Sequence, residues 1–162
     1  MSTALAVIRD EHRSIGAVLK SLRKQVAEAA MGTVPPDFPL YGAMLDYLQA
    51  FPETLHHPKE DQFLFRRLRD RCPQCSELLG ELEAQHKSGA KALARLRETL
   101  TEGGRSGDMR PVADALMTYA EFQWNHIRKE EEQVLPLAEH ELSAEDWAFI
   151  DAAFAVNRET RW

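Results

Sequence analysis

Residues 4–30 read ALAVIRDEHRSIGAVLKSLRKQVAEAA. Apolar side chains recur in this stretch at alternating spacings of three and four, which predicts a helix with one buried stripe, packed in a bundle. Ser2 or Thr3 can cap its first turn, and Gly32 with Pro35–Pro36 ends it. The stripe consists of Leu5, Ile8, His12, Ile15, Leu19, Leu22 and Val26. Its histidine takes a place where a hydrophobic residue would normally pack.

The rest of the chain repeats this pattern, and strand signals are almost absent. The expected helices span about 37–71, 73–103, 108–140 and, as a short fifth helix, 144–157. Ser143 with Asp146 is the expected capping pair of the fifth helix. Pro52 and Pro58 should kink the second helix, and residues 102–107 should form a loop. The sequence therefore predicts an all-α fold in one domain over residues 1–162. Its expected form is an antiparallel up-down-up-down four-helix bundle, about residues 4–140, with a short additional C-terminal helix.

The composition excludes several classes of partner. Charged residues make up 28% of the chain with both signs interspersed, and the formal net charge is -6. A phosphate backbone would be repelled, so nucleic acid is not an expected partner. No stretch approaches the roughly 20 apolar residues that span a bilayer, and the N-terminus lacks the apolar region of a signal peptide. We expect a cytoplasmic protein with no membrane partner, and the residues leave the oligomeric state open.

Each of the four long helices carries a histidine in its apolar stripe. Two helices also carry a glutamate four residues later, so the two side chains point the same way, one turn apart. No lysine or arginine in the stripes would neutralise these buried carboxylates, whereas a polyvalent cation would. Four imidazoles and two carboxylates are more ligands than one tetrahedral zinc ion can bind. They suit two octahedral first-row metal ions, above all iron or manganese, and zinc remains an alternative. The candidate ligands are His12, His56, Glu60, His86, His126 and Glu130.

This ordered set resembles the hemerythrin-like (HHE cation-binding) family over most of the chain. The matching elements are His12, FPETLHHPKE (residues 51–60) continuing into FLF (63–65), EAQH (83–86), and HIRKEE (126–131) followed by Leu135-Pro136. The resemblance implies an antiparallel four-helix bundle with a di-iron centre, bridged by oxo or hydroxo. It also implies that Glu60 and Glu130 bridge the irons and that the four stripe histidines bind them.

One departure shapes the implied function. The family's oxygen carriers have a further histidine one turn away on the third helix, where this chain has Leu82 and Ala90. Open iron positions then imply binding of O2, nitric oxide or peroxide, for carriage, sensing or iron and stress handling. A redox enzyme of peroxidase, catalase-like or nitric oxide-reducing type and an iron donor are the alternatives. A metal-free helical interaction module with a buried polar network is a weaker one, and no catalytic residue is predicted.

Several other polar residues are weaker candidates. His57 lies about 100° from His56 on an ideal helix, so we expect it at the surface or supporting a ligand rather than binding metal. Glu83 is the other possible extra ligand. A solvated or supporting role is expected for Glu53, Glu131 and Glu132, and a contact with the helix dipole for His140.

Cys72 and Cys75 form a C-x-x-C pair at a helix start. That position can lower a thiol pKa and permit redox chemistry. The thioredoxin-like setting of such pairs is missing here, so a structural or incidental role is favoured.

Overall fold

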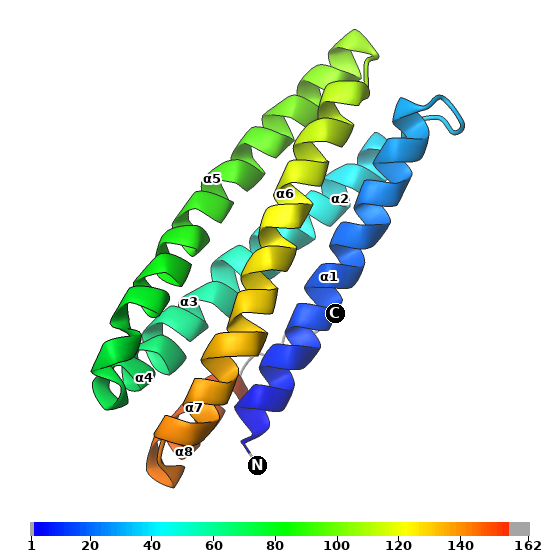
Figure 1. The fold of residues 1–162 in the computed structure, drawn as a ribbon. Coiled ribbons are helices and arrows are strands. Elements are labelled where there is room, and N and C mark those ends of the chain that lie inside the picture. The colour runs from blue at the N-terminus through cyan, green and yellow to red at the C-terminus, as the bar shows by residue number, and fades with distance from the viewer. Residues whose placement is uncertain (1, 156–162) are drawn as a thin grey trace.

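The computed structural model describes residues 2–155, and every regular element in that range is helical (Figure 1). The all-α prediction is therefore confirmed for this part of the chain. The α-helices are α1 (Thr3–Ala30), α2 (Phe38–Leu48), α3 (His57–Lys59), α4 (Arg66–Arg71), α5 (Ser76–Ser106), α6 (Arg110–Lys129), α7 (Leu135–Glu141) and α8 (Ala144–Ala155). Wide π turns form η1 (Gln49–His56), η2 (Glu60–Phe65) and η4 (Glu130–Val134), and η3 (Pro73–Cys75) is a 3₁₀ turn. Residues 156 and 157 of the expected fifth helix lie outside the described residues.

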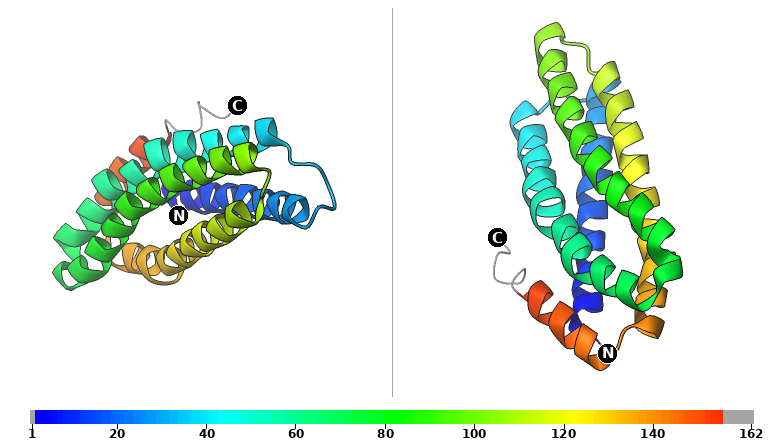
Figure 2. Two further views of the ribbon diagram at one scale, coloured as in Figure 1. Left: turned by 90° about the horizontal axis from the view of Figure 1, so that it is seen from above. Right: turned by 90° about the vertical axis from the view of Figure 1, so that its left-hand side faces the viewer.

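These elements line up as four long helical rods that lie side by side (Figures 1 and 2). The first rod is α1, the second runs from α2 to α4, the third is α5, and the fourth runs from α6 to α7. The first rod contacts α2 and α6, and α5 contacts the same two helices. Each rod thus packs between two neighbours around a shared core. Helix α8 covers one end of the rods, where it contacts α1 and η2.

The ends of the helices follow local sequence signals. Ser2 caps α1 by accepting a hydrogen bond from the Leu5 N–H. Ser143 and Asp146 form the expected capping pair at the start of α8, each accepting from the other's backbone N–H. Arg71 also donates to Asp146, and this bond ties α8 to the second rod.

The predicted loop at residues 102–107 is wrong for most of its length. Helix α5 continues to Ser106 and ends where Gly107 adopts a φ of 76°. Gly103 stays helical, and its lack of a side chain makes room for α6 rather than for a turn. A Cβ there would lie 2.7 Å from Val112 Cγ2. The glycine therefore permits α5 to approach α6 closely.

The second rod accommodates its prolines through π turns. Pro52 lies inside η1, and Pro58 lies in the three-residue α3 between η1 and η2. A proline removes a backbone donor, and a wider turn lets the helix continue past the gap. The fourth rod widens at η4, just before Pro136. Since η2 begins at Glu60 and η4 at Glu130, both predicted bridging residues open a π turn.

The core has two hydrophobic clusters with a polar layer between them. The lower cluster includes Ile8, Leu64, Leu82 and Val134 and lies on the side of α8. The upper cluster includes Ile15, Leu48, Leu93 and Ala120. Along each rod, the stripe histidine falls between a residue of one cluster and a residue of the other. Every stripe position predicted for the first helix is buried. None of the helices within residues 2–155 is long and apolar enough to cross a membrane.

Candidate metal centre

All six residues predicted as ligands lie in the polar layer, and each is at most 6% exposed. They come from every rod: His12 from α1, His56 from η1, Glu60 from η2, His86 from α5, His126 from α6 and Glu130 from η4. The helical periodicity that placed them in apolar stripes thus leads to one common site.

The two carboxylates occupy the middle of this site. Glu60 Oε1 lies 3.1 Å from His56 Nε2 and 3.5 Å from His12 Nε2. Glu130 Oε1 lies 3.2 Å from His126 Nε2, and its Oε2 lies 3.2 Å from His12 Nε2. His86 Nε2 is 3.5 Å from both carboxylates. The ion pairs found for Glu60 and Glu130 within residues 2–155 are all with histidine.

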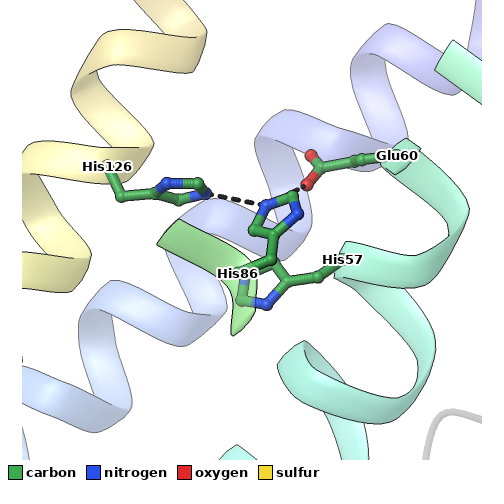
Figure 3. A group of neighbouring side chains, drawn as sticks. All are labelled: His57, Glu60, His86 and His126. Carbon is green, nitrogen blue, oxygen red and sulfur yellow. Dashed lines mark hydrogen bonds and ion pairs between the residues drawn. The ribbon is translucent and has the colours of Figure 1, made fainter. Parts of the chain in front are cut away.

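The ligand atoms form two groups, each able to hold one metal ion, and the atoms within a group lie within 4.8 Å of one another. The first group is His12, His56, Glu60 and Glu130, and the second is His57, Glu60, His86 and His126 (Figure 3). In the second group, His86 Nε2 and His126 Nε2 face each other at 2.9 Å, a separation that suits two ligands of one ion. Glu60 belongs to both groups, as a bridging carboxylate would.

Buried polar atoms without hydrogen-bond partners are concentrated here. Seven such side-chain atoms occur among the described residues, and six of them belong to the two groups. Native proteins seldom leave buried polar atoms unpaired. Lone pairs that converge on a cation explain the five such atoms of His12, His56, Glu60 and Glu130, so the donor set fits a bound metal.

Comparison with known families agrees with this geometry. The model of the hemerythrin HHE cation binding domain matches residues 3–138. The chain belongs to this family. The match includes every candidate ligand and confirms the resemblance read from the sequence. No curated protein and no solved structure matches the chain.

His57 is a residue of this hemerythrin-like site whose burial the sequence did not predict. It is 4% exposed, so the expectation of a surface position is wrong. An offset of about 100° from His56 does not bring the side chain to solvent here, because its ring packs against the rings of His86 and His126 from the third and fourth rods. Its ring stacks on that of His86, with centroids 4.2 Å apart and planes inclined by 12° (Figure 3). Because a ring nitrogen's lone pair lies in the ring plane, both rings can bind one ion only after one of them turns.

The stripe histidines of the hemerythrin-like domain are held by oxygen atoms on their outer side. Each turns Nε2 inward and sets Nδ1 against a side-chain oxygen. The pairs are His12–Glu131 (3.0 Å), His56–Glu11 (2.7 Å), His86–Asp61 (2.8 Å) and His126–Gln85 (2.8 Å). These oxygens can only accept, so Nδ1 keeps its proton and Nε2 is the nitrogen that can bind a metal once any proton on it has been displaced. The supporting role expected for Glu131 agrees with this contact, while Glu11, Asp61 and Gln85 were missed.

The charges of the metal-free centre are strongly coupled. Burial alone would lower the pKa of His56, but the charge of Glu60 and the hydrogen bond to Glu11 raise it to about 9. Burial would also lower the pKa of His86, but the hydrogen bonds to Asp61 and Glu130 raise it to about 10. Burial and Glu130 would raise the pKa of Glu60, yet His56 and His12 lower it to about 2. Protons on the imidazoles thus neutralise the carboxylates when no metal does.

The remaining sequence candidates lie outside both groups. Glu83 accepts two hydrogen bonds from Arg69, at 3.2 and 3.1 Å, so its carboxylate has another partner. The His140 side chain is 83% exposed and pairs with Glu141. Cys72 and Cys75 form a disulfide in the lower hydrophobic cluster, in keeping with the structural role that the sequence favoured.

Substituting Glu11 tests whether the outer oxygens matter. We expect Glu11→Gln to lower metal affinity roughly 10- to 100-fold, because the His56 imidazole loses its charged acceptor. Competition with a chelator measures the affinity. Glu98→Gln, at an exposed position on α5, is the matched control and should leave the metal affinity unchanged. An affinity equal to that of the native chain would show that Glu11 does not support His56 as a ligand.

Proposed function

We propose that this hemerythrin-like chain is a non-haem di-iron protein that binds O2, nitric oxide or peroxide in its core. The proposed ligands are His12, His56, Glu60, His86, His126 and Glu130, with Glu60 and Glu130 as bridges. The proposed architecture is one domain over residues 1–162, an antiparallel up-down-up-down four-helix bundle closed by the short α8. The observation that carries the proposal is the pair of four-residue groups that share Glu60.

The chemistry of the donor set supports two first-row metal ions. Imidazole nitrogens and carboxylate oxygens bind iron, manganese and zinc, and iron when bound supplies the electronic chemistry for small-ligand binding. The chain's own residues would neutralise the charge of the metal ions, orient the imidazole ligands and shield the site from water. Glu60 and Glu130 contribute the negative charge, and the outer oxygens set the direction of each imidazole.

The apolar layers on both sides of the centre keep water away from it. Leu64 and Phe65 are fully buried below it, and the Phe65 ring stacks on His86 with centroids 5.8 Å apart. A low local dielectric strengthens the interaction of the carboxylates with a cation. A small ligand can approach such a site more readily than a large polar substrate, which favours diatomic molecules and peroxide.

Metal content and the optical spectrum test the proposal. Protein expressed with iron should contain about two irons per chain, as expected for a bridged bundle-core site, and should show di-ferric bands in the near ultraviolet. The spectrum should change with dithionite, and then with O2 or nitric oxide. The variant His86→Ala should lose metal, while His140→Ala, whose histidine is exposed, should not. A fully folded chain that takes up no transition metal would refute the proposal.

A further inference from the structure

A buried glutamate beside the candidate metal centre has no role in the proposed function. Glu53 on η1 precedes His57 by four residues, and both side chains are buried. Glu53 Oε2 lies 3.6 Å from His57 Nδ1, and this is the one ion pair found for Glu53 within residues 2–155. A buried carboxylate is costly unless it is paired. The position of Glu53 therefore points to a task that involves His57.

The neighbouring rods enclose the Glu53 carboxylate. A Cβ at Gly89 of α5 would touch Glu53 Oε1 at 3.6 Å and would crowd Nε2 of Gln123 on α6 at 3.1 Å. These contacts leave the Glu53 side chain only 4% exposed. The carboxylate is thus held inside the bundle, next to His57.

Two of the seven unpaired buried atoms belong to this pair. They are His57 Nδ1 and Glu53 Oε1. The distance of 3.6 Å between the two groups exceeds that of a normal hydrogen bond. A carboxylate turns easily about its last bond, so either oxygen can accept from the ring. Since metal binding explains the other five atoms, a hydrogen bond that forms when metal binds would account for all seven.

The pair also has the arrangement of a metal ligand and its support. Each stripe histidine sets Nδ1 against a side-chain oxygen at 2.7 to 3.0 Å, which is the usual support of a metal-binding imidazole. Glu53 takes this place for His57. A ring nitrogen of His57 lies within 4.8 Å of the ligand atoms of Glu60, His86 and His126 (Figure 3). His57 therefore has both the position and the supporting oxygen of a ligand.

His57 and His86 can bind one ion only if one ring turns, and the contacts of His86 hold its ring in place. Its Nδ1 lies 2.8 Å from Asp61, and its ring stacks on Phe65. His57 Nδ1 has no hydrogen bond among the described residues, and rotation of an imidazole about its Cβ–Cγ bond is only weakly restricted. His57 is therefore the ring that is free to turn, and the rotation can bring Nδ1 within reach of Glu53.

We propose that His57 is a fifth imidazole ligand of the metal centre, bound to the ion of the second group, and that Glu53 holds its outer nitrogen. This inference rests on the proposed metal-binding function and adds one ligand and one positioning residue to it. When metal is bound, the His57 ring is inclined to that of His86, and its Nδ1–H donates to Glu53.

Nuclear magnetic resonance of the native chain with ¹⁵N-labelled histidine tests the ligand directly. The chain has six histidines, and Zn²⁺ is a diamagnetic probe that imidazole binds. Saturating Zn²⁺ should produce the signal of a metal-bound ring nitrogen from every histidine except the exposed His140. His57→Phe identifies the His57 signal by its absence. If His86 and His126 bind Zn²⁺ and His57 does not, the proposal is overturned and the metal centre remains.

Iron affinity, measured by competition with a chelator, tests the role of Glu53. Glu53→Gln should lower it roughly 10- to 100-fold. His57→Phe, which keeps an aromatic ring beside His86, should lower it at least as much. Because Glu53 acts through His57, Glu53→Gln should have no further effect in a chain that already carries His57→Phe. Glu121→Gln, at an exposed position on α6, is the matched control and should bind iron like the native chain.

The outcomes separate this inference from the di-iron proposal. Independent effects of the two substitutions would show that Glu53 does not act through His57. Native iron affinity in folded His57→Phe, checked by circular dichroism, would overturn the ligand role, while the iron content of the native chain would still support the di-iron centre. A native chain that binds no iron would overturn both.

Discussion

Replacing Glu60 with glutamine should abolish binding of both metal ions rather than of one. Glu60 is the residue shared by the two ligand groups, and its oxygens lie within 3.5 Å of three histidines from three rods. An amide has neither the negative charge nor the two equivalent oxygens of a bridging carboxylate. Metal content per chain and the loss of the near-ultraviolet spectrum measure the effect.

Two comparisons make the Glu60 experiment specific. His126→Ala removes a ligand from one group only, so this variant should retain more metal than Glu60→Gln. Glu132→Gln changes an exposed glutamate of η4 and should bind metal like the native chain. Circular dichroism checks that each variant remains helical. Full metal occupancy in folded Glu60→Gln would rule out a bridging role for this residue.

The second large effect should appear in the pH dependence of metal binding. The metal-free fold raises the pKa of His56 to about 9 and that of His86 to about 10, from 6.5. Both imidazoles therefore hold protons at neutral pH, and a metal must displace them. Metal affinity should rise with pH between 6.5 and 9, by up to about tenfold per pH unit for each proton released. Proton release on addition of metal at pH 7 is the direct measurement.

Stability of the metal-free chain should follow the opposite trend in this range. The raised pKa values of His56 and His86 contribute stability that is fully present below pH 6.5. This contribution is lost as the pH rises through 9 to 10. The lowered pKa of Glu60, about 2, contributes stability above 4.5 that is lost as pH falls through 2. Thermal unfolding with and without chelator should show the metal-free midpoint falling, and the gain from metal growing, from pH 6.5 to 9. Metal uptake without proton release would contradict both trends.

Residue spacing along single helices was sufficient to predict much of this protein. The stripe from Leu5 to Val26, the caps at Ser2 and Ser143, and the inward direction of His12 all follow from a period of 3.6 residues and from side-chain chemistry. His56 with Glu60 and His126 with Glu130 are one turn apart, so each pair shares a face whatever the helix packs against. The family could be inferred because its ordered ligands are read along the chain.

Other features depend on how the rods meet. Glu11 supports His56 from another rod, and Asp61 supports His86 in the same way, which no spacing along one helix reveals. Gly103 is helical because Val112 approaches it closely, although the glycine-rich sequence of residues 102–107 favours a loop.

Packing between the rods also decides the position of His57. Its offset of about 100° from His56 points away from the predicted stripe, but that direction faces His86 and His126 rather than solvent. Glu53, Gly89 and Gln123 meet because three rods have a particular rotation and register. Periodicity is a local property of one helix, so the buried face of each helix can be predicted from residue spacing alone. Which side chains meet across those faces depends on the packing between helices, which residue spacing does not specify.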